Sequence, residues 1–256
     1  MALLNSLIQN PRYTLVRGLG RFSVVRSGVT GLKRLVSEAR SRQYERELSA
    51  KFPVSLFSNV DRDAFLAAMT RDGCAFGLTL SDRIVDSITA YSESNPVFAF
   101  REEKLGFAPQ ERIQAQTALG KEILLAQYFN TLKNCPAVTE VATDPFLNWV
   151  ALKYLGSVPV FLGCNLWWTY PVNPNLADQM KHAHVFHRDI DDFRFIKFFF
   201  YMSDVKSGDG AHWLVRGSHA RAPHIRFKDY FLTRRFTDSE ITGFYGRPEM
   251  IEVVGK

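Results

Sequence analysis

Two side chains with the types and spacing of a metal site lie in the second half of the chain. They are His187 and Asp189, in the stretch HVFHRDIDDFRFIKFFFYMSDV, which spans residues 184–205. Residues i and i+2 of an extended strand point to the same face, so this spacing brings an imidazole and a carboxylate to one point. These ligand types suit Fe(II), and a site of two histidines and one carboxylate leaves further coordination positions open.

The open positions indicate which chemistry such a site would perform. Two of them would take a bidentate 2-oxo acid, and another would take O₂. The apolar residues that follow the pair would keep water away from the reacting groups. Spacing alone leaves open a plainer interpretation, in which His187 and Asp189 form a hydrogen-bonded pair at the start of a strand. His182 and His184 are a rival pair with the same spacing, and we assign them to a solvated loop.

Strand-like segments in the second half of the chain would position this pair. They are β-branched and aromatic, as buried strands are. The segments are VPVFLGCNLWWTYP (158–171), RFIKFFFYMSDV (194–205), AHWLVRGSH (211–219) and MIEVVGK (250–256).

The segment 194–205 presents two alternating sets of side chains. One set is Phe195, Lys197, Phe199 and Tyr201, and the other is Ile196, Phe198, Phe200 and Met202. We expect one set to line the cavity and the other to pack behind it. We take Lys197 and Tyr201 as candidate contacts of the 2-oxo acid. Asp191 and Asp192 are interpreted as loop or capping acids rather than as ligands.

The first half of the chain reads as helical, with polar residues at the predicted helix starts and glycines at the ends. The predicted caps are Asn59 or Asp61 and then Gly73 for one helix, Ser81 for a second, and Asp144 and Gly156 for a third. Apolar spacing predicts the longest helix over residues 111–134. Helices followed by strands predict the α+β class, with the helices packed against a sheet or a sandwich.

The composition describes an ordinary globular protein with a basic N-terminal segment. Of the 256 residues, 46% are hydrophobic and 23% are charged, and the chain has no apolar run long enough to predict a membrane span. The net charge of +6 equals the Lys and Arg content of residues 1–37, which contain no acid. The remaining chain is therefore neutral, and we expect no nucleic-acid binding. We place a boundary at residue 37, with residues 38–256 as one domain.

Two features bear on where the protein resides. We expect residues 1–37 to be a loosely ordered arm, although their composition also suits an organelle transit peptide or weak contact with an anionic membrane surface. Cys74, Cys135 and Cys164 are odd in number and lack a C-x-x-C pair, which favours a reducing compartment over a disulfide framework. We therefore expect a cytoplasmic protein, with organelle targeting left open.

A longer stretch around the pair resembles a known family. The sequence FHRDIDDFRFIKFFFYMSDVKSGDGAHWLVRGSH (186–219) is similar to the iron-site region of the phytanoyl-CoA dioxygenase family, a branch of the Fe(II)- and 2-oxoglutarate-dependent oxygenases. NLWWTYP (165–171) resembles the strand before that region. TRDGCAFGLTLSDRIVDSI (70–88) resembles the opening helix, turn, strand and helix of the family. The resemblance covers residues 60 to 256.

The resemblance implies a fold, a set of cofactors and a reaction. The fold would be a double-stranded β-helix (jelly roll, cupin-like) buttressed by N-terminal helices, with His187 and Asp189 as two iron ligands. The cofactors would be Fe(II), 2-oxoglutarate and O₂, and the reaction would hydroxylate an aliphatic carbon of a small or lipid-like substrate. The presence of Asp189 favours a hydroxylase over a halogenase, because halogenating relatives lack this carboxylate so that a halide can bind.

The family pattern also includes two later residues that this sequence does not supply. A distal His completes the iron site, and a following Arg binds the far carboxylate of 2-oxoglutarate. In this chain no His follows His224 and no Arg follows Arg247. We expect that the last strands of the domain are missing, so that the chain binds iron weakly and turns over little. The alternative is a non-catalytic jelly-roll binding protein.

Earlier residues replace the distal pair only in part. His219 is the candidate third iron ligand, although its motif RGSH forms a turn in the family. His212 would line the site without binding the metal, and His224 would lie in a surface loop. Arg216, Arg221 and Arg226 are nearby cations, but none has the spacing expected of the Arg that binds 2-oxoglutarate.

Overall fold

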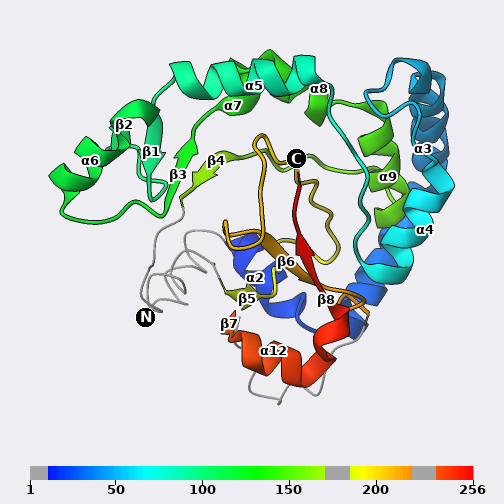
Figure 1. Cartoon of the computed structure of the whole chain (residues 1–256). Helices are drawn as coiled ribbons and strands as arrows, with labels where there is room; N and C mark the ends of the chain where they lie inside the picture. Colours follow the sequence, from blue (N-terminus) through cyan, green and yellow to red (C-terminus); the bar gives the residue numbers. More distant parts are fainter. Residues whose placement is uncertain (1–10, 171–184, 221–234, 256) are drawn as a thin grey trace.

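The computed structural model of the chain describes residues 11–170, 185–220 and 235–255, and its fold is of the predicted α+β class (Figure 1). The helices are α2 (Pro11–Leu19), α3 (Ser23–Ala50), α4 (Arg62–Asp72), α5 (Asp82–Ser94), α6 (Arg112–Leu119), α7 (Thr131–Asn134), α8 (Pro136–Ala142), α9 (Pro145–Leu155) and α12 (Asp238–Tyr245). Short 3-10 turns are η1 (Phe52–Val54), η2 (Pro109–Glu111) and η3 (Arg247–Glu249).

The strands form small antiparallel sheets. They are β1 (Val97–Ala99), β2 (Gly106–Phe107), β3 (Leu125–Tyr128), β4 (Leu166–Thr169), β5 (Phe186–His187), β6 (His212–Val215), β7 (Arg235–Phe236) and β8 (Met250–Val253). One sheet has the order β2-β1-β3-β4, and the other two are the pairs β5-β7 and β6-β8. Within the described ranges these strands do not close into a barrel, so the jelly roll itself stays a prediction.

The helices form a curve around the later strands. In Figure 1, α5 and α8 run along one edge of the molecule, and α3, α4 and α9 run along the adjacent edge. β6 and β8 lie inside this curve, and α12 lies beyond β7 at its open end. The strands that follow residue 185 therefore face a wall of helices.

Local signals placed the helix ends correctly. Asp61 accepts hydrogen bonds from two first-turn amides of α4, each at 3.0 Å, and Gly73 ends this helix with a φ of 75°. Asp144 caps α9 in the same way, and Gly156 ends it. Ser81 occupies the N-cap position of α5, although its side chain makes no capping hydrogen bond. The predicted caps are thus confirmed in position.

The main core lies among α4, α5, α8, α9 and the C-terminal half of α3. Phe146 and Phe57 are each 1% exposed, and their ring centroids lie 5.9 Å apart. Phe65 packs edge-on against Phe146, with centroids 5.6 Å apart. Full burial of one such side chain stabilises the fold by about 1.5–3 kcal/mol. A second, smaller core lies on the sheet that contains β1 and β3.

The predicted single helix over residues 111–134 is wrong between residues 120 and 130, and only its two ends are helical, as α6 and α7. α6 ends at Gly120, whose φ of 60° is a left-handed conformation that glycine adopts without strain. The chain then forms β3, and Ile123 and Leu124 are fully buried beside it. Short apolar runs fit a buried strand as well as a helix face, and for this reason periodicity assigned them wrongly.

Residues 11–37 form α2, a short turn and the first half of α3, rather than a loosely ordered arm. α3 is 28 residues long and passes the boundary predicted at residue 37 without a break. Its C-terminal half packs on α9, where Leu48 is buried and the Tyr44 hydroxyl donates to Asn148 at 3.5 Å. The signal at residue 37 is therefore a change in charge along one continuous helix.

Two of the predicted buried strands are formed only in part. β4 covers the end of segment 158–171, whereas Val160, Phe161 and Leu162 are exposed. Residues 195–201 carry no strand assignment, because no described neighbour pairs with them in a ladder. The predicted strands within 211–219 and 250–256 are confirmed as the antiparallel pair β6 and β8. None of the described helices has the length and apolar character needed to cross a bilayer.

Candidate metal centre

His187 and Asp189 meet as their spacing predicts. His187 ends β5, which pairs antiparallel with β7, and Asp189 follows two residues later. Nε2 of His187 and Oδ1 of Asp189 lie 3.3 Å apart, and the two side chains are 36% and 39% exposed. The pair is therefore held together and is open to a ligand from solvent.

The other ring nitrogen of His187 is held by the main chain. Nδ1–H donates to the carbonyl oxygen of Val185 at 2.8 Å. This bond orients the ring, and it leaves the lone pair of Nε2 available whenever that nitrogen is not protonated. Histidines that bind metals are usually held in this way through their second nitrogen.

The spacing of the two facing atoms fits a shared metal ion. Donor atoms bound about 2.1 Å from a metal and at right angles to each other lie about 3 Å apart. Without a metal, a proton on Nε2 of His187 forms a hydrogen bond to Oδ1 of Asp189. The hydrogen bond to Asp189 raises the pKa of His187, and burial opposes this shift. The same bond lowers the pKa of Asp189 far below its ordinary value, and the contact with Lys197 adds to the effect.

Lys197 places a positive charge against the same carboxylate. Its Nζ lies 2.6 Å from Oδ2 of Asp189 and 2.8 Å from Oδ2 of Asp191. Burial lowers the pKa of Lys197, but the hydrogen bonds to these two carboxylates outweigh burial and raise it. Lys197 thus contacts a candidate iron ligand, and its contact with a 2-oxo acid stays a prediction.

The described residues do not supply a third ligand to this pair. In residues 11–170, 185–220 and 235–255, no three His, Cys, Asp or Glu side chains gather in a way that could hold a metal. The His219 side chain contacts the C-terminal end of α4, where its Nε2–H donates to the carbonyl oxygen of Thr70 at 3.1 Å. Among the described residues, His187 and Asp189 could therefore supply two metal ligands, and no third side chain joins them. His182, His184 and His224 lie outside the described residues.

The segment 195–202 separates a core face from an open face. Its core-facing side chains, packed against the main core, are Ile196, Phe198, Phe200 and Met202. The ring of Phe200 stacks on Phe57 with centroids 5.8 Å apart. Phe199 belongs to the opposite set and is 55% exposed. The prediction that one set packs into the core is confirmed, whereas the lining of a cavity by the other set stays a prediction.

Tyr201 and His212 continue the open face. The Tyr201 hydroxyl donates to the carbonyl oxygen of Val253 at 3.1 Å and accepts from the His212 amide at 3.0 Å. The His212 ring lies 5.0 Å from the Phe199 ring, and Trp167 of β4 contacts Phe199 edge-on at 6.3 Å. The one O–H of Tyr201 is used by the Val253 carbonyl, so this hydroxyl does not donate to a 2-oxo acid in this arrangement.

Sequence reasoning missed how the N-terminal helices support this site. Lys33 of α3 lies 3.5 Å from Asp192, in the loop that follows the pair. The Gly217 amide donates to the carbonyl oxygen of Asp72 at 2.7 Å, beside the contact between His219 and Thr70. These partners lie far apart in the sequence, and no local pattern signals contacts of this kind.

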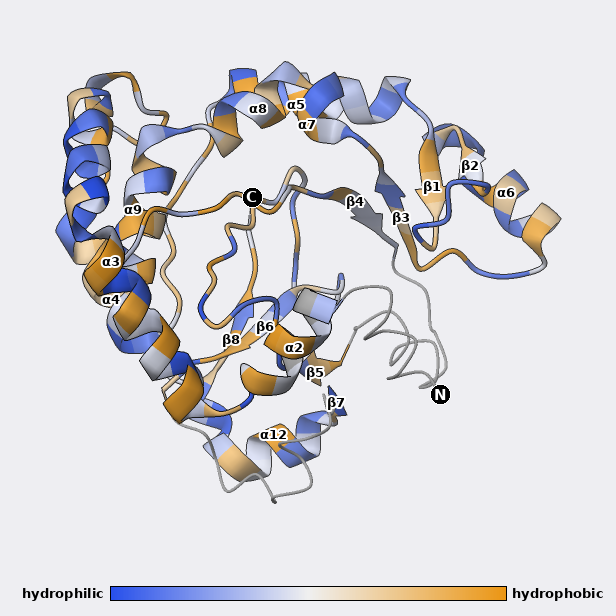
Figure 2. Cartoon of the chain, turned by 180° about the vertical axis from the view of Figure 1, so that it is seen from behind, coloured by the Kyte–Doolittle hydropathy of each residue, from blue (hydrophilic) through white to orange (hydrophobic). Residues whose placement is uncertain are grey.

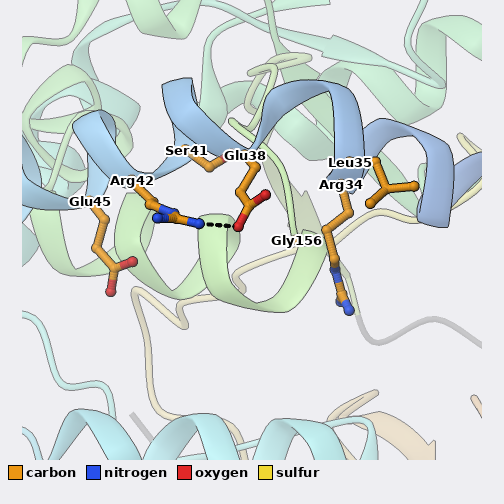
Figure 3. A pocket seen from close by; sticks show the side chains of 7 residues that line it. All are labelled: Arg34, Leu35, Glu38, Ser41, Arg42, Glu45 and Gly156. Carbon is orange, nitrogen blue, oxygen red and sulfur yellow. Dashed lines mark hydrogen bonds and ion pairs between the residues drawn. The ribbon is translucent and has the colours of Figure 1, made fainter.

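A hollow elsewhere on the surface holds none of the predicted site residues. It is a shallow pocket of about 350 Å³ between α3 and the end of α9 (Figure 3), lined by Arg34, Leu35, Glu38, Ser41, Arg42, Glu45 and Gly156. Its charges are of both signs, and Arg42 and Glu38 form an ion pair within it. We assign no chemistry to this pocket.

Comparison with protein-family models, with curated proteins and with solved structures finds no match for this chain. The resemblance to the phytanoyl-CoA dioxygenase family therefore stays a prediction from the quoted residues. Any functional conclusion must rest on those residues and on the geometry of the pair.

Proposed function

We propose that this chain is an Fe(II)- and 2-oxoglutarate-dependent oxygenase of the phytanoyl-CoA dioxygenase type, built on a double-stranded β-helix. Its iron ligands are His187 and Asp189, and its substrate is a small or lipid-like molecule that is hydroxylated at an aliphatic carbon. The observation that supports this most is the approach of Nε2 and Oδ1 to 3.3 Å while Nδ1 is held by Val185. A metal ion would replace the proton between the two atoms.

The protein's contribution to this chemistry is position and surroundings. Bound iron, together with 2-oxoglutarate and O₂, would supply the oxidation of a C–H bond. The Val185 carbonyl holds the imidazole in one orientation, and the core-facing row of segment 195–202 fixes the segment whose Lys197 contacts Asp189. The exposed ring of Phe199 gives this segment an apolar surface, which favours an apolar part of the substrate and disfavours water.

One contact favours the second candidate, a jelly-roll binding protein without a working metal. The ammonium of Lys197, 2.6 Å from Asp189, already neutralises the carboxylate that a metal would need. A cation supplied by the chain itself would balance the charge of Asp189 without a metal. The two candidates differ in what happens when the charge of Lys197 is removed.

The first experiment measures metal binding directly. Mn(II) serves as a redox-stable probe for Fe(II), and its free concentration is followed by electron paramagnetic resonance. We expect weak binding by the chain, and binding weaker by about a hundredfold in His187→Ala and Asp189→Ala, because each removes a ligand. His219→Ala is the matched control, since this ring is bonded to Thr70. Equal binding by all four proteins would overturn the proposed site.

The second experiment adds the cosubstrate. Fe(II) and 2-oxoglutarate are added without oxygen, and the weak charge-transfer absorption of such complexes is recorded. We expect little or no band, because the described residues supply two ligands and no third. A strong band would show that another side chain completes the site. His182→Ala, His184→Ala and His224→Ala would then identify it, each compared with His212→Ala.

Substitution of Lys197 separates the two candidates. In the oxygenase, Lys197→Met should strengthen Mn(II) binding by about tenfold, because the competing charge at Asp189 is gone. In a metal-free binding protein the same change should leave Mn(II) binding undetectable. Lys206→Met, in an exposed loop, controls for the loss of one positive charge on the surface.

A further inference from the structure

The first half of α3 carries an apolar stripe that faces solvent. Val24, Leu32, Leu35 and Val36 are 81%, 62%, 74% and 77% exposed. At 100° per residue, these positions fall within a sector of about 120° on the helix surface. Four large apolar side chains on one face of one helix are more than the scattered exposure of an ordinary surface.

The stripe points away from the body of the protein. Leu48 is buried where α3 packs on α9, and Tyr44 bonds to Asn148 of α9. By the same helical geometry, these two positions lie about 140–180° around the helix from the middle of the stripe. α3 runs along the outer edge of the molecule in both views, with apolar segments on it coloured orange in Figure 2. No other described element covers this face.

The charge around the stripe is positive. Residues 1–37 carry Arg12, Arg17, Arg21, Arg26, Lys33 and Arg34 and no acid. The first acid of α3 is Glu38, and it is paired with Arg42. Arg40 is exposed and lies beside the Val36 edge of the stripe by helical position, and Arg42, at the opposite edge, is paired with Glu38. An apolar face bordered by cations and free of unpaired acids is complementary to an anionic phospholipid surface.

We propose that the first half of α3 binds to the surface of an anionic phospholipid bilayer. Val24, Leu32, Leu35 and Val36 would enter the boundary between headgroups and acyl chains, and Arg40 with the other cations of the basic N-terminal segment would meet lipid phosphates. A nucleic acid would use the cations but not the apolar stripe. A second copy of the chain would use the stripe but would bring the same positive charge against it. The bilayer alone uses both features.

The inference is independent of the iron chemistry, and vesicle co-sedimentation of the full chain tests it. Vesicles of phosphatidylcholine alone are compared with vesicles that contain about one third phosphatidylglycerol, at low and high salt. We expect binding to the anionic vesicles at least tenfold stronger than to the neutral ones, and weakened by salt. Equal binding to both kinds of vesicle, or none to either, would overturn the proposal.

Two pairs of variants test the two features of the surface separately. Leu32→Ser/Leu35→Ser should weaken binding at least tenfold, and its control is Val160→Ser/Leu162→Ser, an equally exposed apolar pair in a loop. Arg40→Gln should weaken binding about fivefold, and its control is Lys133→Gln, which removes one exposed charge elsewhere. Unchanged circular dichroism and melting temperature show that each variant is folded.

The other occupants of the stripe would give different results. If the chain dimerises on gel filtration, and Leu32→Ser/Leu35→Ser makes it monomeric while control and variant bind vesicles alike, the stripe is a chain-to-chain interface and the proposal is wrong. If duplex DNA binds more tightly than anionic vesicles, and the leucine variant binds it unchanged, the surface is a site for nucleic acid and the proposal is again wrong.

Discussion

The helical region, residues 44–158, and the site region, residues 185–255, are stabilised in different ways. Of the apolar side chains that are buried among the described residues, only Ile190 and Ile241 belong to the site region. That region packs against the helical core through partly buried side chains such as Phe200, and polar contacts, such as those of Lys197 with Asp189 and of Tyr201 with Val253, add to this packing. The comparison teaches that the packing energy of this chain resides mainly in one region and its candidate chemistry in another.

The largest expected effect is the loss of a ring from the helical core. Phe146 is 1% exposed and contacts Phe57 and Phe65. Phe146→Ala should lower the free energy of unfolding by about 3–5 kcal/mol, measured by urea denaturation, because it removes buried area and leaves a cavity. Phe199→Ala, at a ring that is 55% exposed, should cost less than about 1 kcal/mol. A similar loss in the free energy of unfolding for Phe146→Ala and Phe199→Ala would contradict the difference between the two regions.

A polar group inside the helical region should have the next largest effect. Asp144 is 3% exposed and accepts hydrogen bonds from the Ser55 hydroxyl, the Leu56 amide and the first turn of α9. Asp144→Ala should destabilise the chain by about 2–4 kcal/mol, because buried donors lose their partner. Asp61→Ala, at an exposed cap of the same kind, should cost about 1 kcal/mol. Thermal unfolding of the two variants checks this order.

The contact between the two regions gives a third prediction. A Cβ at Gly73 would lie 2.3 Å from Nδ1 of His219, and Gly73 also has a φ of 75°. Gly73→Ala should therefore destabilise the chain by about 1–3 kcal/mol. Gly77 has a φ of 96° and open space around it, so Gly77→Ala measures the backbone strain alone.

A double variant separates the clash from the strain. Gly73→Ala/His219→Ala should recover the part of the loss by which Gly73→Ala exceeds Gly77→Ala. No recovery in urea denaturation would mean that the site region does not rest on the end of α4.

The smallest effect on stability is expected at the ion cluster of the site region. Lys197 and Asp189 are 41% and 39% exposed, and solvent screens pairs of this kind. Lys197→Met should change the free energy of unfolding by less than about 1 kcal/mol. A loss as large as that of Phe146→Ala would place Lys197 among the residues that hold the fold together.

Local patterns predicted the features that depend on few neighbouring residues. The caps Asp61 and Asp144 were predictable because a short acidic side chain reaches the amides two and three residues later. His187 and Asp189 were predictable because a strand repeats every two residues. In both cases the geometry is set by the backbone between the residues, so spacing alone carries the information.

Features that depend on distant partners were not predictable. The contact of His219 with Thr70 joins residues that are 149 positions apart, and no pattern around either residue indicates the other. The strand at Leu125 exists because β1 and β4 pair with it, which no window around residues 111–134 contains. Lys197 was singled out by its place in an alternating run, but its partners depend on the path of the loop between residues 189 and 197.

The long reach of the contact between His219 and Thr70 has a consequence for biosynthesis. Leu152 is the last buried apolar residue of the helical region, and His187 follows it by several dozen residues. At about 5–20 residues per second, translation would leave several seconds in which the helical region can fold before residues 187–219 are all made. The candidate site would then form by docking onto the finished end of α4. Errors in the helical region would therefore be inherited by the site.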